Sequence, residues 1–288
     1  MLPTPLNAGV PGSVAHSLKA QAKSVNANVV RVHDLRLWRE VSVTIIAIMS
    51  TYLLIHGAWH GGWCWRKVAP LLEAKGHKVL APDLPGHGDD RTATATVTLK
   101  SYTDRICEIA NAQTEPVILA GHSMGGVAIT QAAENCPKQI GALVYVCAFL
   151  PRNGDSLMTW ASQDQESMVN PSTTDQRADG TIDFKPERSR EAFYGNCGED
   201  DVAFAQSRLC AQSGAPLGTP VVTTAERWGR IPRYYIECAR DCAITLKLQR
   251  EMQKASPCRQ AFSIDTDHSP FFSAPEQVAD ILSRIGSA

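Results

Sequence analysis

The sequence lacks an excess of charge of either sign, and it lacks a long uninterrupted apolar run. Its 288 residues carry 28 basic and 29 acidic side chains, a formal net charge of −1, which is not the electrostatic footprint of a nucleic-acid binder. The apolar stretch at 41–55 contains four serine and threonine residues. It therefore falls short of the roughly 20 apolar residues of a membrane-spanning helix. We expect neither a nucleic-acid partner nor a membrane span.

The nine cysteines also lack a pattern. Their number is odd, they are scattered along the chain, and no Cys-x-x-Cys pair occurs, so neither a zinc site nor a disulfide framework is indicated. Cys147 lies in an apolar run, and a buried small hydrophobe is the simplest interpretation of such a cysteine. We therefore expect a reducing compartment, the cytoplasm, and no metal site.

The first 48 residues differ in composition from the rest of the chain. Positions 1–40 are rich in Ala, Ser, Asn and Val and carry five basic residues against two acidic ones. A targeting peptide has this composition. We favour the alternative that Met49 is the natural start, because the first core strand follows it directly. Residues 1–48 would then be a poorly ordered leader or extension.

Beyond this segment, short apolar runs alternate with stretches of helical periodicity. Several of the runs, such as 142–146, are apolar at nearly every position, which is typical of parallel strands buried on both faces. The pattern predicts an α/β fold with a mostly parallel sheet and helices on both faces, formed by residues 49–150 and 230–288. The expected strands are 52–55, 77–82, 116–120, 142–146, 233–238 and 260–264. The expected helices are 65–74, 98–112, 127–133, 243–254 and 275–285.

The rhythm of strands and helices breaks between residues 151 and 229. A structureless loop of nearly 80 residues is improbable in a compact domain, so this segment is expected to be an inserted helical cap over the core. Its large aromatic residues could line an apolar substrate pocket or could form the cap's own small core, and both interpretations stay open. These residues are Trp160, Phe184, Phe193 and Phe204.

The segment 121–125 carries the clearest chemical signal. It reads Gly-His-Ser-Met-Gly, follows the strand-like run 116–120 and precedes the helical run 127–133. In this setting Gly-x-Ser-x-Gly is typical of a nucleophile elbow, a tight turn that presents a serine at the end of a strand. Ser123 is therefore the expected catalytic nucleophile, at the start of a helix whose dipole favours developing negative charge.

A serine nucleophile needs a base and a group that orients the base. His268 is the only histidine after Ser123, so it is the expected base if the chain order is serine, acid, histidine. Asp241 follows the predicted strand 233–238 and is our choice for the acid. Asp267 is the alternative, although a residue adjacent to His268 seldom aims its side chain at that imidazole.

Two backbone N–H groups are expected to form an oxyanion hole. One belongs to Met124, the residue after the nucleophile, and the other comes from the loop after the first core strand. That loop, 56–63, reads His-Gly-Ala-Trp-His-Gly-Gly-Trp. Ala58 is its best-placed donor.

From about Met49 to its end, the chain resembles the α/β-hydrolase superfamily. The segments 56–65, 82–88 and 121–126 are similar to a branch that contains plant hydroxynitrile lyases, methyl-ester esterases and bacterial esterases, including pyrethroid-hydrolysing ones. The resemblance implies a small helical cap, a reaction without a cofactor, and a triad acid at the position of Asp241. We assign substrate binding to Gly57, His60 and Trp160.

Two positions distinguish the lyases from the esterases in this group. The lyases carry a lysine after the catalytic histidine, where this chain has Ser269, and tend to carry a threonine where it has Gly57. Both differences favour hydrolysis. We expect a serine carboxylesterase for small-molecule esters with apolar, bulky or aromatic, pyrethroid-like groups. The alternatives are a hydroxynitrile lyase-like enzyme and a low-turnover ligand receptor on the same fold. The sequence does not decide between ester, amide and thioester substrates, or whether the protein forms a homo-oligomer.

Overall fold

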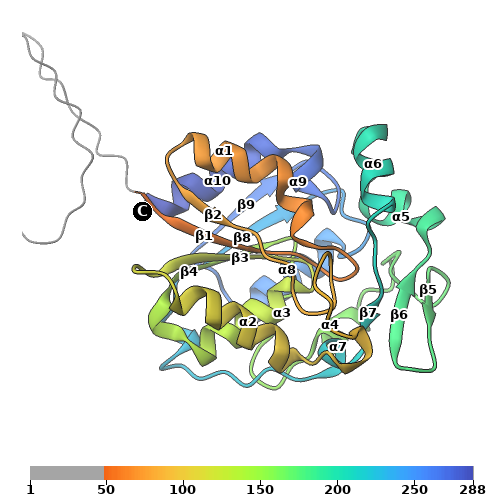
Figure 1. Cartoon of the computed structure of the whole chain (residues 1–288), viewed down its shortest axis with the longest axis horizontal. Helices are drawn as coiled ribbons and strands as arrows, with labels where there is room; N and C mark the ends of the chain where they lie inside the picture. The colour runs from red at the N-terminus through yellow and green to blue at the C-terminus, as the bar shows by residue number, and fades with distance from the viewer. Residues whose placement is uncertain (1–48, 288) are drawn as a thin grey trace, which may run out of the picture. The chain divides into compact units, whose positions relative to one another are not determined.

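The described part of the chain is built on one six-stranded sheet (Figure 1). The computed structural model describes residues 49–287, and the interpretation of residues 1–48 as a leader lies outside them. The strand order is β2-β1-β3-β4-β8-β9, and every neighbouring pair is parallel, which confirms the predicted parallel sheet. The strands are β1 (Thr51–Ile55), β2 (Lys78–Leu80), β3 (Val117–His122), β4 (Ile140–Val146), β8 (Arg233–Cys238) and β9 (Gln260–Ile264).

Helices cover both faces of this sheet, as predicted. In Figure 1, α1 and α10 lie together on one face, and α2 and α3 lie together on the other. All residues of β3 and all but Gly141 of β4 are buried between these layers, which explains why both strands are apolar without alternation. The helices of the core are α1 (Val68–Ala74), α2 (Leu99–Asn111), α3 (Gly125–Asn135), α8 (Leu246–Ala255), α9 (Pro270–Ser273) and α10 (Pro275–Gly286).

The segment 151–229 contains strands as well as the expected helices. The strands pair antiparallel in the order β5-β6-β7 and form a second small sheet. The hairpin between β5 and β6 turns at Asp179-Gly180, where Gly180 has a φ of +82°. An Asp-Gly pair is a hairpin signal, and the purely helical prediction overlooked it. The elements are α4 (Leu157–Ala161), β5 (Thr174–Gln176), β6 (Thr181–Phe184), α5 (Pro186–Phe193), α6 (Glu199–Gln206), β7 (Gln212–Ser213) and α7 (Ala215–Gly218).

Polar contacts join segment 151–229 to the loop that follows β1. The Asp201 carboxylate in α6 accepts from Arg66 at 2.8 Å and from Lys67 at 2.6 Å. The indole N–H of Trp59 donates to the carbonyl oxygen of Ile182 at 2.9 Å. These bonds hold the segment against the carboxyl ends of the central strands.

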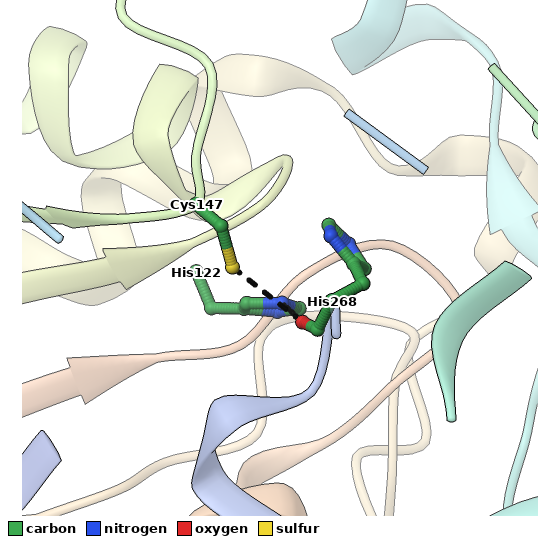
Figure 2. A group of neighbouring side chains, drawn as sticks. All are labelled: His122, Cys147 and His268. Atoms are coloured by element: carbon green, nitrogen blue, oxygen red, sulfur yellow. Dashed lines mark hydrogen bonds between the residues drawn. The ribbon is translucent and has the colours of Figure 1, made fainter. Parts of the chain in front are cut away.

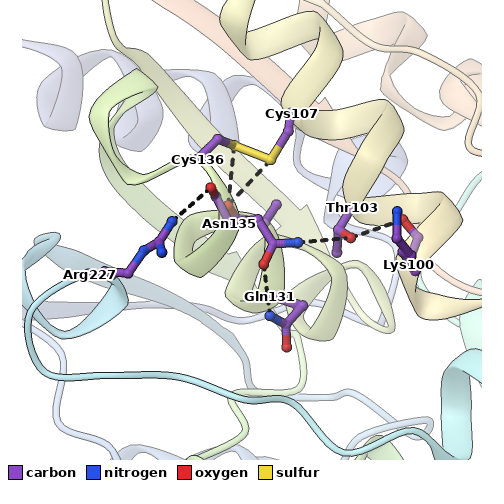
Figure 3. Close-up of a disulfide and its surroundings, with 8 residues drawn as sticks. Lys100, Thr103, Cys107, Gln131, Asn135, Cys136 and Arg227 are labelled. Carbon is purple, nitrogen blue, oxygen red and sulfur yellow. Dashed lines mark hydrogen bonds between the residues drawn. A yellow bond between two sulfur atoms is a disulfide. The ribbon is translucent and has the colours of Figure 1, made fainter.

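A disulfide joins Cys107 in α2 to Cys136, which follows the last residue of α3 (Figure 3). The cysteine pattern indicated no disulfide framework, and it gave no sign of this single pair. The two residues are 29 positions apart, and they meet because α2 packs along α3, which no cysteine spacing signals. This disulfide does not support the reducing compartment that we inferred from the cysteines. Separately, no helix between residues 49 and 287 is long and apolar enough to cross a membrane.

Reducing the disulfide should lower the free energy of unfolding by about 3 kcal/mol, because a cross-link over a loop of this size restricts the unfolded chain. The measurement is urea unfolding of untreated protein, of reduced protein and of the Cys107→Ser/Cys136→Ser double variant. Thiol titration of unfolded, unreduced protein should find seven thiols. The Cys258→Ser variant is the control and should respond to reduction like the wild type. Nine titratable thiols would contradict the pairing.

Three fully buried histidines surround the carboxyl ends of β1 and β3. His56 Nδ1 donates to the Gly57 carbonyl oxygen at 2.8 Å, and its Nε2 accepts from the Leu84 N–H at 3.0 Å. His60 and His122 likewise each donate to one main-chain carbonyl oxygen, at 2.7 Å. Burial lowers the pKa of all three imidazoles, to about 4 for His60. The folded protein therefore keeps these side chains neutral.

Stability should fall as the pH drops below about 6.5, the ordinary pKa of histidine. The unfolded chain takes up a proton on each of these imidazoles there, and the folded protein does not. Each histidine should therefore lower the free energy of unfolding by up to about 1.4 kcal/mol per pH unit. Urea unfolding at pH 7.5, 6.5 and 5.5 measures the slope. In the His60→Gln variant the free energy of unfolding should depend less steeply on pH. Equal stability at the three pH values would contradict the neutral, buried state of these residues.

Candidate active site

The turn that carries Ser123 has the geometry expected of a nucleophile elbow. Ser123 lies between β3 and α3 and has a φ of +54°, a left-handed conformation that costs free energy in a residue with a side chain. A Cβ atom at Gly126 would lie 2.1 Å from the carbonyl oxygen of Phe149, and one at Gly125 would lie 2.7 Å from that of His56. Only glycines allow the first turn of α3 to approach these loops so closely.

Backbone strain gathers at this edge of the sheet. Within residues 49–287, the non-glycine residues with positive φ are Trp59 at +62°, Ser123 at +54° and Cys147 at +35°. They follow β1, β3 and β4, three neighbouring parallel strands. Strained backbone that persists in a well-packed fold is concentrated at functional sites, so the carboxyl edge of the sheet is the place to look for the chemistry.

The loops after β8 and β9 place Asp241 against His268. His268 Nδ1 lies 2.7 Å from Asp241 Oδ2, and both side chains are buried. Asp241 Oδ1 accepts from the N–H groups of Ala243 and Ile244 at 2.7 and 2.8 Å. Burial raises the pKa of the Asp241 carboxyl, while the imidazole and the two N–H groups act against that rise. A carboxylate on Nδ1 fixes the imidazole tautomer that leaves Nε2 free to accept a proton.

Asp267, the alternative acid, binds other groups. Its oxygens accept from the N–H groups of Asn196 at 2.7 Å and Ser269 at 3.1 Å, and from Ser273 Oγ at 2.7 Å. It joins the loop of His268 to segment 151–229. The structure thus brings Asp241, and not Asp267, to the imidazole.

Ser123 and His268 line a cavity of about 930 Å³ between the sheet edge and segment 151–229. No hydrogen bond joins the two side chains in the part of the chain that the structure describes, and such contacts are often long before substrate binds. The walls are largely apolar. They include Phe149, Leu157, Phe193, Leu217, Ile244 and Leu248.

Ala58 and Met124 also line the cavity, beside Ser123. Across residues 49–287, the structure offers no hydrogen-bond acceptor to the backbone N–H of either residue. Met124 directly precedes the first residue of α3, and free N–H groups at such a position favour an anion. The two predicted donors are therefore available at the cavity wall.

The three residues assigned to substrate binding do not line the cavity. Trp160 is buried, and its indole N–H donates to Asp155 Oδ2 at 3.1 Å. The imidazole of His60 is held between the Ala58 carbonyl oxygen and the Tyr194 hydroxyl, each at 2.7 Å. Gly57 lies behind the nucleophile, since a Cβ atom there would be 2.8 Å from Ser123 Cβ.

Most of the aromatic residues of segment 151–229 are packing residues. Phe193 lines the cavity, but Phe184 packs on Trp59, and Phe204 packs under the guanidinium of Arg66. The other wall residues from this segment include the apolar Leu157 and Met158 of α4 and a mixed polar and apolar stretch between residues 162 and 176. Sequence reasoning missed them because it weighed aromatic residues only, although α4 begins with these two apolar residues.

Comparison with known proteins identifies the family of the chain. A profile of the α/β-hydrolase family matches residues 52–281. The chain is 35% identical over 249 residues to the pyrethroid hydrolase of Sphingobium wenxiniae, which covers 83% of this chain and 89% of that protein. It is 31% identical over 255 residues to methylesterase 9 of Arabidopsis thaliana, and this match covers 82% of this chain and 98% of that protein.

Solved structures extend the likeness to three dimensions. The crystal structure of a pyrethroid hydrolase from Sphingobium faniae has a TM-score of 0.75 and 30% identity, with 83% of this chain and 98% of that chain covered. A variant of tomato methylketone synthase I, with a TM-score of 0.76, 22% identity and 83% of this chain and 98% of that chain covered, shares the fold. The chain therefore belongs to the α/β-hydrolase family.

Proposed function

We propose that the protein is a serine carboxylesterase. The observation that carries the proposal is the buried Asp241–His268 pair, which opens on the same cavity as Ser123 on its strained turn. These are the base, its orienting acid and the nucleophile of an acyl-transfer site, in the chain order of the family.

In the proposed reaction, His268 Nε2 takes the proton of Ser123 Oγ while that oxygen attacks the ester carbonyl carbon. The negative charge that develops on the carbonyl oxygen is stabilised by the N–H groups of Ala58 and Met124. His268 then gives its proton to the leaving alcohol, and Asp241 stabilises the transient imidazolium. Water, activated by the same imidazole, hydrolyses the acyl-enzyme and frees Ser123.

The cavity supports neutral substrates with bulky apolar groups. Its volume of about 930 Å³ lies at the upper end of the usual range for small-molecule sites. Its lining contains two carboxylates, Asp164 and Asp175, and no lysine or arginine. A substrate with its own carboxylate would find no counter-charge there. Similarity to proteins named pyrethroid hydrolase and methylesterase is consistent with neutral esters, and we propose 151–229 as the cap that shapes the acyl and alcohol sites.

Hydroxynitrile cleavage is the second candidate, and two features disfavour it. A departing cyanide needs a nearby positive charge, but Ser269 follows His268 and the cavity lining has no lysine or arginine. A threonine at position 57 would place its Cβ 2.8 Å from Ser123 Cβ, so the local backbone would have to move. A receptor with slow turnover differs only in rate, and would show one burst of product without further hydrolysis.

The Ser123→Ala variant should lose at least about 10⁴-fold in kcat for a p-nitrophenyl ester, because the hydroxyl forms the acyl-enzyme. The fold should persist, since the methyl group of alanine replaces only the Oγ atom. The measurement is steady-state hydrolysis, with circular dichroism to compare the folded state. Wild-type kcat in a contamination-free preparation would contradict the nucleophile assignment.

The same assay separates esterase from lyase. We expect wild-type kcat/KM to be higher for p-nitrophenyl and pyrethroid-like esters than for mandelonitrile, with negligible cyanide release. Faster cleavage of mandelonitrile would overturn the esterase proposal while leaving the nucleophile in place.

The Asp241→Asn variant should lose on the order of 10³-fold or more in kcat, because an amide on His268 Nδ1 no longer fixes the reactive tautomer. Asp267→Asn is the matched control. It makes the same chemical change in the next loop, leaves the Asp241–His268 bond intact, and should cost stability more than kcat. Wild-type kcat in Asp241→Asn together with an inactive Asp267→Asn would identify Asp267, and not Asp241, as the acid that orients His268.

A further inference from the structure

His122, Cys147 and His268 form a buried cluster of the kind that binds metals. Their potential ligand atoms all lie within 4.8 Å of one another. In Figure 2 the side chains of His122 and Cys147 converge on the main-chain oxygen of His268. The ring of His268 lies against that of His122, with centroids 4.6 Å apart. His122 Nε2 lies 2.7 Å from that oxygen and Cys147 Sγ lies 3.5 Å from it.

The contacts within this cluster assign the protons. A carbonyl oxygen only accepts, so the proton of His122 is on Nε2 and the thiol of Cys147 is the second, weaker donor. His122 Nδ1 is buried and has no hydrogen-bond partner within residues 49–287. Its ring packs against Phe271, with centroids 4.9 Å apart. One strong hydrogen bond and ring packing therefore fix the orientation of His122.

The position of His122 in the chain gives this bond its importance. His122 is the last residue of β3 and directly precedes Ser123. Its bond to the carbonyl of His268 therefore connects the strand of the nucleophile to the backbone of the base. Asp241 fixes the His268 ring through Nδ1, but it comes from β8 and does not set how far the His268 backbone lies from Ser123.

We propose that His122, assisted by Cys147, is a positioning residue that sets the distance between His268 and Ser123 by holding the main-chain carbonyl of His268. The inference rests on the proposed function. His122 does not line the cavity. It contacts His268 through this bond and through its ring, whose centroid lies 4.6 Å from that of the His268 ring, and it acts through His268. A misplacement of about 1 Å between reacting groups can cost on the order of 10²-fold in rate, so a single bond at this place has a measurable effect.

The competing explanation is that His122 only satisfies a buried carbonyl group. A purely structural role would change stability and leave the kinetics of the folded fraction unchanged. The two explanations are separated by variants of equal polarity and different reach. His122→Gln can place its amide N–H near the position of Nε2, and His122→Asn is too short to reach the carbonyl. His77→Asn serves as the control. His77 is another buried histidine; its Nε2 lies 3.0 Å from Ser283 Oγ, and it does not line the cavity.

We expect His122→Asn to lose roughly 10- to 100-fold in kcat with little change in KM, and His122→Gln to retain most of the wild-type kcat. The second-order rate of labelling by a fluorophosphonate should follow the same order. His77→Asn should match the wild type. Kinetics are measured well below the unfolding temperature of each variant. Cys147→Ser, which keeps a donor, should stay active, and Cys147→Ala should lose less than His122→Asn.

Equal kcat for folded His122→Asn and His122→Gln, whether high or low, would overturn the inference. If His122→Asn does not fold, the second measurement is the low-field NMR resonance of the proton in the His268–Asp241 hydrogen bond. We expect the same chemical shift in His122→Gln as in the wild type. A changed chemical shift would also overturn the inference. This resonance does not depend on hydrolysis. Wild-type activity in Ser123→Ala would instead contradict the proposed function, and it would not affect the conclusion that His122 holds the His268 carbonyl.

Discussion

The close contact between the start of α3 and the loop after β4 is the constraint on which the rest of the site depends. Gly126 lies against the Phe149 carbonyl, where no side chain fits. The same loops exchange backbone hydrogen bonds with the turn: the Ser123 N–H donates to Val146, and the Phe149 N–H donates to the Ser123 carbonyl. These contacts hold Ser123 in a left-handed conformation that it would not adopt alone. The direction of its hydroxyl is a property of the packed fold.

Much of the architecture could be predicted because local and global preferences agree. The segment 142–146 is apolar at nearly every position because helices cover both faces of the sheet. The helix α2 begins where expected because Thr98 and Ser101 bond each other's backbone N–H groups, a capping arrangement that needs only local sequence. Motif and chain order also singled out Ser123 and His268, and the structure places both on one cavity.

Other features depend on contacts between distant residues, and the sequence does not display them. Cys107 and Cys136 pair because two helices lie side by side. Trp160 was assigned to substrate, but its polar N–H is better satisfied by Asp155 inside the protein than by an apolar cavity. The Gly-x-Ser-x-Gly motif leaves the identity of residue 122 open, and here it is His122. Its partner is a carbonyl 146 residues further along the chain, and only the folded structure brings the two together.

The absence of lysine and arginine from the cavity lining also bears on how a catalytic cycle would end. Hydrolysis of a neutral ester leaves a carboxylate in a space that contains Asp164 and Asp175 and has largely apolar walls. Lys185 lies 3.5 Å from Asp175 and offsets its charge. An anion in these surroundings is nevertheless poorly solvated, and it meets the like charge of Asp164. The acid product should therefore leave readily while the neutral ester is retained. The same wall that selects the substrate would then protect the enzyme from inhibition by its product.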